Sequence, residues 1–274
     1  MTVAARSVDI EVRLLLDAIY SRFHYDFRSY SMASLKRRIL VALPKLQCAT
    51  VSALQEKLLH EPTTLGELLQ FLTVQVSDMF RDPPFFVAFR ERVVPELETY
   101  PSLKIWIAGC SSGEEVYSLA IVLAEAGLLA RTLIYATDIN PAALSKAEAG
   151  VYALDRVATF SANYQRAGGR GSLSEYYTAA YGGAAFARRL RSRIVFSDHS
   201  LATDHVFAEV QVVSCRNVLI YFDRPLQDRA VGLFEGALCR RGFLGLGSRE
   251  TLRFSPHAGA FRDCAAEERW YQRC

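Results

Sequence analysis

The sequence predicts an α/β protein in which a doubly wound, Rossmann-like sheet follows a small all-helical domain. From residue 101 onward, short apolar runs alternate with segments of helical periodicity, which is typical of a parallel sheet covered by helices. Residues 8–75 show helical spacing only, with apolar side chains recurring at Val12, Leu16 and Ile19. The 274 residues are enough for one large domain and a smaller companion.

The change of pattern sets the expected boundaries. We expect an N-terminal helical domain over residues 1–75, a linker with a connecting helix over 76–100, and the sheet domain over 101–274. Within the linker, Pro83 and Pro84 are expected to stop any preceding helix, and a helix is predicted for 85–97.

The sheet domain contains elements that can be justified one by one. The run Leu103–Ala108 is apolar and bounded by Pro101 and Gly109, as in a buried parallel strand. The helix over 141–150 begins with a proline and ends with a glycine. The remaining predictions are strands at 131–137, 210–214 and 242–247, helices at 114–126 and 225–240, and a closing antiparallel pair within 260–273.

One stretch breaks the alternation of strands and helices. β-rich segments flank Gly182-Gly183, and the basic run 187–193 follows before a strand at 194–196. The simplest interpretation is a β-hairpin inserted over about residues 172–196.

Composition excludes several classes of protein. A net charge of +3 gives no reason to expect a nucleic-acid partner. The six cysteines show no C-x-x-C pair and no histidine at ligand spacing, so neither a disulfide framework nor a metal site is expected. Charges occur throughout the first thirty residues, and the apolar run 118–130 is short and broken by Glu125. We therefore expect a cytoplasmic protein without direct membrane insertion.

In a doubly wound sheet, ligands bind beyond the carboxyl ends of the strands. The loop after the first strand begins at Gly109, where glycine lets the backbone approach a ligand, and ends at Glu114 and Glu115. Two carboxylates at a helix start disfavour a pyrophosphate, and G-x-G-x-x-G is absent. The loop suits a ligand with a cationic end, such as the ammonium of a methionine moiety.

Two further strand ends carry polar side chains. Asp138 follows the second strand, where a carboxylate can accept hydrogen bonds from both hydroxyls of a ribose or can cap the helix that starts at Pro141. The glycine loop upstream favours the ribose. After the strand 210–214, one short segment brings Arg216, Asn217 and Tyr221 to the same edge, which is dense for a simple turn.

Four blocks occur in a characteristic order: Ser77–Asp82 (SDMFRD), Gly109–Ser118 (GCSSGEEVYS), Ala136–Asn140 (ATDIN) and Cys215–Phe222 (CRNVLIYF). In this order they resemble the CheR-type chemotaxis receptor protein-glutamate O-methyltransferases, over a span from about Val8 to the C-terminus. The resemblance implies the S-adenosylmethionine-dependent methyltransferase fold with an inserted small antiparallel β-subdomain. It also implies methyl transfer from S-adenosylmethionine to glutamate side chains of chemoreceptors, with S-adenosylhomocysteine as product.

The resemblance also assigns roles to residues. It implies cofactor contacts at Gln75, Ser77, Arg81, Gly109, Glu114, Asp138, Ser200, Leu201, Asn217 and Val218. The family block N-x-T-x-F-F-R is altered here, because Gln75 and Ser77 replace its first two polar residues, and Ser200 stands where Asn is common. Arg81 and Tyr221 match the side chains at the reacting centre, with Arg81 orienting the substrate carboxylate and Tyr221 near the sulfur and methyl.

Each of these roles has a plainer alternative. Arg81 could form a surface salt bridge with Asp78 or Asp82, and Tyr221 could simply pack behind a strand. For the substrate, the resemblance favours a basic helix face of Lys36, Arg37 and Arg38 that attracts the acidic cytoplasmic helices of chemoreceptors; the alternative is a solvated face. In some family members the β-subdomain docks a receptor C-terminal peptide by strand addition, and the sequence leaves this open.

Three other functions remain in competition. A nicotinamide-dependent enzyme could use the same sheet, although the missing G-x-G-x-x-G and Glu114 count against it. A non-catalytic cofactor-binding module could regulate a chemosensory-like signalling complex. The same methyl transfer could also serve a receptor-like protein outside swimming, such as one in surface sensing.

Overall fold

The computed structural model describes residues 3–274, and it begins with a domain of helices only. The four helices are α1 (Val3–Phe23), α2 (Met32–Lys45), α3 (Val51–His60) and α4 (Thr64–Leu72). They enclose a core of their own, in which Ile19, Ile39 and Leu54 are fully buried. The hydroxyl of Thr50 accepts a hydrogen bond from the N–H of Ala53 at 3.0 Å and so caps α3. The predicted all-helical domain is confirmed.

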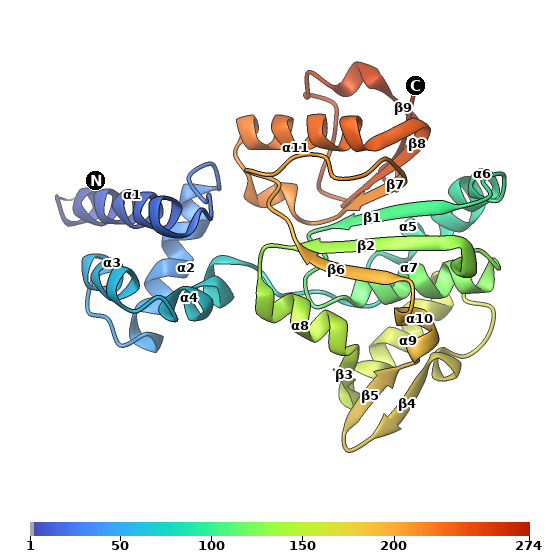
Figure 1. The fold of residues 1–274 in the computed structure, drawn as a ribbon, viewed down its shortest axis with the longest axis horizontal. Coiled ribbons are helices and arrows are strands. Elements are labelled where there is room, and N and C mark those ends of the chain that lie inside the picture. The colour runs from blue at the N-terminus through green and yellow to red at the C-terminus, as the bar shows by residue number, and fades with distance from the viewer. Residues whose placement is uncertain (1–2) are drawn as a thin grey trace.

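The second domain is built on a seven-stranded sheet in the order β6-β2-β1-β7-β8-β10-β9 (Figure 1). Its strands are β1 (Leu103–Ala108), β2 (Thr132–Asp138), β6 (Ile194–Asp198), β7 (Val210–Cys215), β8 (Leu238–Leu246), β9 (Phe261–Ala265) and β10 (Trp270–Arg273). The first five are parallel, whereas β10 runs antiparallel to both β8 and β9. The doubly wound sheet and its closing antiparallel pair are confirmed.

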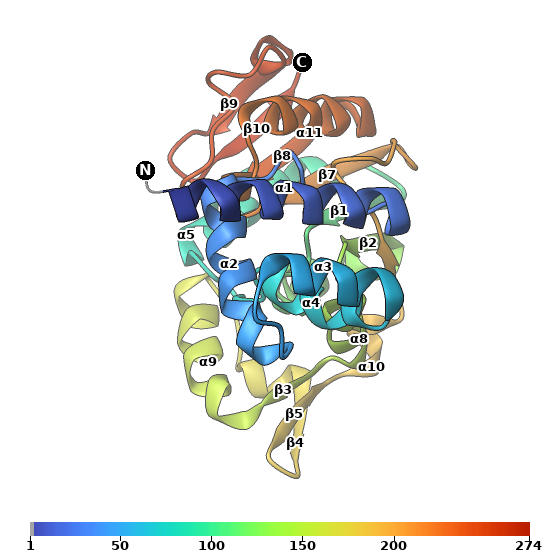
Figure 2. The ribbon, with the colours of Figure 1, turned by 90° about the vertical axis from the view of Figure 1, so that its left-hand side faces the viewer.

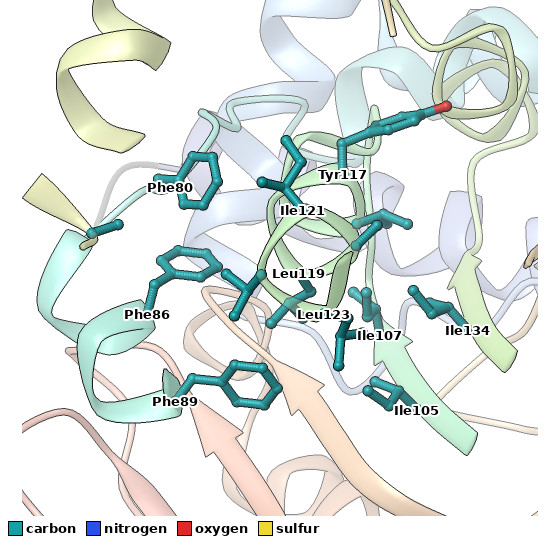
Figure 3. Close-up of a cluster of buried hydrophobic side chains, with 14 of the residues drawn as sticks. Phe80, Phe86, Phe89, Ile105, Ile107, Tyr117, Leu119, Ile121, Leu123 and Ile134 are labelled. Carbon is teal, nitrogen blue, oxygen red and sulfur yellow. The ribbon is translucent and has the colours of Figure 1, made fainter. Parts of the chain in front are cut away.

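Helices cover both faces of this sheet. The helices are α5 (Pro83–Ala88), α6 (Val94–Leu97), α7 (Glu114–Glu125), α8 (Pro141–Ala149), α9 (Val157–Arg166), α10 (Arg188–Arg191) and α11 (Arg224–Ala237). On one face, Ile105 and Ile107 of β1 pack against Ile121 of α7 and the phenylalanines of the connecting helix (Figure 3). On the other face, Trp106 of β1 packs against Phe234 of α11. Alternate residues of β1 thus belong to two cores.

The chain passes from β1 to β2 and β6 on one side and then returns to β7 on the other side of β1. The strand order therefore reverses between β1 and β7, where a doubly wound sheet leaves a crevice at its carboxyl ends. Seen from the side of the helical domain, α1 to α4 lie in front of the sheet domain (Figure 2). The helical domain thus faces the crevice.

Several predicted boundaries were wrong. Pro83 and Pro84 do not stop a helix but begin α5, because proline is favoured in the first turn, where its missing N–H is not needed. The connecting helix is also interrupted by a π-helical turn, Phe89–Val93, just before Pro95, which cannot donate a backbone hydrogen bond. Helix α11 ends at Ala237, since Leu238 already pairs with Val210 in the sheet.

The insertion is larger than the predicted hairpin. Strands β4 (Tyr177–Ala180) and β5 (Gly183–Phe186) form that hairpin, and β3 (Val151–Ala153) adds to it in the order β3-β5-β4. Strand β3 has only three residues, too few for a recognisable alternation of polar and apolar side chains. The basic run that follows forms the short helix α10. In the described part of the chain, no helix has both the length and the hydrophobicity that a membrane span requires.

Candidate functional site

A cavity of about 350 Å³ lies at the reversal of strand order, between the sheet and the helical domain. Its walls are the segment after α4 (Thr73–Asp78 and Arg81), the loop after β1 (Gly109–Ser111), the end of β2 (Asp138, Ile139), the segment after β7 (Arg216–Val218, Tyr221, Phe222), and Tyr30, Arg38, Leu72, Glu115, His199 and Leu201. A volume of this size suits a small molecule. Both domains contribute to it.

Asp138 is fixed at the end of β2 by backbone donors. Its Oδ2 accepts a hydrogen bond from the N–H of Ser111 at 2.8 Å, and its Oδ1 accepts one from the N–H of Asn140 at 2.9 Å. Helix α8 is capped by Asn140, whose side-chain oxygen accepts from the N–H of Ala142 and Ala143. The helix-cap alternative for Asp138 is therefore wrong. Each carboxylate oxygen keeps a lone pair for a ligand hydroxyl.

Burial controls the charge of this carboxyl. Asp138 is 8% exposed, and desolvation raises its pKa above 3.8, although the hydrogen bonds from Asn140 and Ser111 oppose the shift. Two hydroxyl donors from a ligand would replace part of the lost hydration. The buried carboxylate thus favours a ligand that carries neighbouring hydroxyls.

The loop after β1 is folded tightly against Asp138. Gly109 has φ +75°, and a Cβ at this position would lie 2.4 Å from Cγ2 of Val218. The N–H groups of Gly109 and Cys110 both donate to the carbonyl of Thr137, each at 2.8 Å. Glycine is required here for conformation and for space. The backbone of this loop can consequently lie directly against a ligand.

The two glutamates of α7 have different environments. Glu114 is fully buried and does not line the cavity; its Oε1 accepts from Nη1 of Arg156 at 2.8 Å and its Oε2 from the hydroxyl of Ser112 at 2.7 Å. Glu115 does line the cavity, where it accepts from Ser214 at 2.6 Å and from Arg216 at 3.0 Å. The cofactor contact expected from the resemblance was Glu114, whereas the structure brings Glu115 to the cavity wall.

Arg81 lies in the cavity wall, and its guanidinium makes one hydrogen bond to the described residues, from Nη1 to the carbonyl of Val76 at 3.2 Å. Asp78 pairs with Arg156 at 2.9 Å, and Asp82 pairs with Arg216 at 3.1 Å. Among the side chains that the structure describes, no carboxylate lies within ion-pair distance of Arg81. The salt bridge of Arg81 with Asp78 or Asp82 that was considered as an alternative is therefore absent among the described residues.

Tyr221 is held in the cavity wall by the helical domain. The guanidinium of Arg38 lies 4.7 Å from the centroid of its ring, and Nη1 of Arg38 donates to the carbonyl of Leu72 at 2.6 Å. The N–H of Ser31 donates to the carbonyl of Tyr221 at 2.7 Å. Burial lowers the pKa of the Arg38 guanidinium. The phenol ring therefore faces the cavity from a fixed position.

The three consecutive basic residues of α2, Lys36, Arg37 and Arg38, do not share one face. Lys36 pairs with Asp9 at 2.5 Å, Arg37 is exposed to solvent, and Arg38 lies in the cavity wall. Successive helical residues point about 100° apart, so three neighbours cannot form one face. Of these three, Arg37 is the one that stays exposed and makes no ion pair with a described side chain.

Most of the other predicted residues meet at the cavity. Gln75, Ser77, Leu201, Asn217 and Val218 all line it. The amide oxygen of Gln75 accepts from the hydroxyl of Ser111 at 3.0 Å, which joins two walls. Ser200 is the exception, since it lines a neighbouring cavity that shares only Ile139 and His199 with the main one.

Glu250, which was not predicted from the sequence, organises the segment after β7. It is 4% exposed; its Oε2 accepts from the N–H of Gly247 at 2.7 Å and of Asn217 at 3.0 Å, and its Oε1 accepts from the N–H of Ile220 at 3.3 Å. Burial raises the pKa of this carboxyl. A single glutamate after a strand carries no local signal for this role, because two of its three partners, Asn217 and Ile220, lie about thirty residues away.

Replacing Glu250 with alanine should lower the free energy of unfolding by at least about 2 kcal/mol, because three backbone N–H groups lose their acceptor and each buried orphan costs roughly 1–3 kcal/mol. Urea unfolding of the purified protein measures this. The exposed Glu209→Ala serves as the control and should change stability by less than about 0.5 kcal/mol. Equal effects of the two changes would contradict the role given to Glu250.

Comparison with known proteins identifies both domains. Residues 75–268 match the S-adenosylmethionine (SAM) binding domain of CheR methyltransferase, and residues 10–73 match its all-alpha domain. The chain is 57% identical to a Pseudomonas putida protein that carries the provisional name methyltransferase Cher3, over 98% of each chain.

Relatives with chemotaxis in their names are more distant. The chain is 32% identical to chemotaxis protein methyltransferase 1 of Pseudomonas aeruginosa, over 75% of this chain and 83% of that one. It is 30% identical to a chemotaxis protein methyltransferase of Listeria innocua, over 83% and 84%. These matches overturn the nicotinamide-dependent alternative. The chain belongs to the CheR methyltransferase family, and its cofactor is S-adenosylmethionine.

Proposed function

We propose that this protein transfers the methyl group of S-adenosylmethionine to glutamate side chains on the cytoplasmic helices of chemoreceptors, which forms glutamate methyl esters in sensory adaptation. The relatives named chemotaxis protein methyltransferases support this proposal. One observation on the cavity itself carries it, namely the charge balance of its arginines.

Three arginines line the cavity, and their environments differ. Arg216 is neutralised by Glu115 at 3.0 Å and Asp82 at 3.1 Å. Arg38 and Arg81 have no carboxylate partner among the described side chains. Cations in a partly desolvated wall are stabilised by an opposite charge. A glutamate carboxylate entering from a substrate would supply that charge beside Arg81.

The cavity fits the cofactor on the features of its own residues. Asp138 would accept hydrogen bonds from the two ribose hydroxyls, and the loop at Gly109 would lie against the ligand without a side chain between them. Gln75, Ser77, Leu201, Asn217 and Val218 would complete the walls. When bound, the cofactor supplies an electrophilic methyl group on a sulfonium.

The residues of the chain then have to align the reacting groups, and none of them has to act as a general acid or base. A glutamate carboxylate is already ionised at neutral pH and needs no general base. Arg81 would hold one carboxylate oxygen so that the other lies in line with the methyl group. Tyr221, fixed by Arg38, would form the wall beside the reacting atoms and exclude water.

The approach of the substrate is part of the same proposal. Arg37 projects from α2 into solvent, on the helix whose Arg38 lines the cavity, and would attract an acidic receptor helix through long-range electrostatics. Strand β4 forms one edge of the small three-stranded sheet, where a receptor C-terminal peptide could add as a further strand.

Incubation of the protein with methyl-labelled cofactor and purified cytoplasmic fragments of chemoreceptors should transfer label to the fragment. Mild alkali should release that label as methanol, because carboxyl methyl esters hydrolyse readily, and replacing the acceptor glutamates with alanine should abolish it. Tight binding of S-adenosylhomocysteine without label on any receptor fragment would contradict the proposal. That result would favour a non-catalytic regulatory module of a chemosensory-like complex.

A further inference from the structure

Arg156 joins two walls of the cofactor site although it does not itself line the cavity. It lies in the turn after β3, within the insertion. Its Nη1 donates to Oε1 of Glu114 at 2.8 Å, and its Nη2 donates to Oδ1 of Asp78 at 2.9 Å and to the carbonyl oxygen of Ser77. Ser77 and Asp78 line the cavity, and Glu114 begins the helix that follows the glycine loop. One guanidinium therefore fixes the distance between these walls.

The carboxylate of Glu114 is fully used inside the protein. Its side chain is 1% exposed, with Arg156 on one oxygen and the hydroxyl of Ser112 on the other. The carbonyl of Ser112 in turn accepts from the hydroxyl of Tyr152 in β3, at 2.8 Å. Both the glycine loop and Glu114 are thus fastened to the segment 152–156 of the insertion.

The guanidinium that makes these contacts is itself held in place. It lies 4.7 Å from the centroid of the Phe160 ring, on the first turns of α9. Its planar fork points Nη1 at Glu114 and Nη2 at Asp78 in fixed directions, whereas a lysine ammonium would have to reach both carboxylates from one nitrogen. The arrangement is therefore specific to arginine.

We infer that Arg156 is a positioning residue for S-adenosylmethionine, and that Glu114 acts through Arg156 instead of touching the methionine ammonium directly. Arg156 holds the segment at Ser77 against the glycine loop and thereby makes the inserted β-subdomain part of the cofactor site. The inference relies on the family's cofactor and is independent of which methyl acceptor the protein uses.

Calorimetric titration with S-adenosylhomocysteine tests this inference. Arg156→Gln should bind about tenfold or more weakly, since misplacement of a wall by about 1 Å is enough for such a loss. Arg156→Lys should fall between Arg156→Gln and the natural protein. Glu114→Gln should lose less affinity than Arg156→Gln, because the amide oxygen still accepts from Arg156. In steady-state methyl transfer, Arg156→Gln should raise the KM for S-adenosylmethionine with little change in kcat, whereas partial unfolding would lower kcat alone.

Two further variants separate positioning from stability. Arg189→Gln, in the same insertion, removes an exposed arginine that donates to the carbonyl of Glu175, and it should bind S-adenosylhomocysteine as the natural protein does. Because Arg156→Gln leaves Glu114 buried without a cation, the double variant E114Q/R156Q should regain melting temperature but not affinity. Natural affinity in Arg156→Gln or in the double variant would overturn the inference. A larger loss in Glu114→Gln than in Arg156→Gln would overturn it too, because it indicates direct contact.

Discussion

Replacing Arg81 with alanine is expected to lower kcat for methyl transfer to receptor fragments by about a hundredfold, the loss typical when a fixed donor at the reacting centre is removed. Arg81 is one of two cavity cations without a carboxylate partner among the described side chains. Its proposed role is to hold the substrate carboxylate in line with the methyl group. Arg81→Lys should recover only part of the rate, because an ammonium keeps the charge but not the planar fork.

Initial rates at varied concentrations of both substrates measure this effect, and titration with S-adenosylhomocysteine separates it from cofactor binding. The matched control is Arg241→Ala, which removes an exposed arginine that pairs with Glu96 toward the other end of the parallel strands. It should leave kcat within about twofold, as expected for a surface change away from the site. A fall in cofactor affinity with kcat at saturating cofactor unchanged would show that Arg81 serves cofactor binding alone.

The elements that the sequence predicted well have a local cause. Strand β1 was predicted with its observed bounds, because a buried parallel strand is a continuous apolar run and the flanking proline and glycine end it. The start of helix α3 has a local cause too, because the side chain of Thr50 caps it. The place of the cavity was predicted as well, since parallel strands place their carboxyl ends at one edge.

The features that the sequence did not predict depend on distant contacts. Strand β3 exists only because β5, about thirty residues later, pairs with it. The ion pairs of Arg156 span 42 residues to Glu114 and 78 to Asp78, and Glu250 reaches Asn217 across 33. Which of Glu114 and Glu115 faces the cavity also depends on distant contacts. Adjacent helical residues differ by about 100° in direction, and only tertiary packing decides which one faces the cavity.

Asp138→Asn is expected to weaken binding of S-adenosylhomocysteine by about a hundredfold, or roughly 2.7 kcal/mol. Both carboxylate oxygens accept from backbone N–H groups, of Ser111 and Asn140, so either orientation of the amide would set its NH₂ against a donor. One of two charge-assisted hydrogen bonds to the ribose is lost as well. Calorimetric titration of both proteins measures the difference.

The control for this change is Asp198→Asn, because Asp198 pairs in register with Asp138 on the neighbouring strand β6 and is exposed. It should bind S-adenosylhomocysteine as the natural protein does, and equal losses in the two variants would contradict a specific ribose contact.

The pH dependence of stability and of ligand affinity provides a second test of Asp138. Because burial raises the folded pKa of Asp138 above 3.8, the group favours the folded state at low pH, and this contribution is lost as pH rises through that folded pKa.

The pH dependence of ligand affinity should have the opposite sign to that of folding stability. In the proposed site, ribose hydroxyls would donate to the ionised carboxylate of Asp138 and would stabilise the charged form that burial destabilises. Affinity for S-adenosylhomocysteine should therefore fall as pH drops from neutral toward the raised pKa of Asp138, and the slope should disappear in Asp138→Asn, which does not titrate. A slope that persists unchanged in Asp138→Asn would assign the titration to another group and remove Asp138 from the ribose contact. The buried carboxylate thus costs stability at neutral pH, and the ligand offsets that cost only when Asp138 is charged.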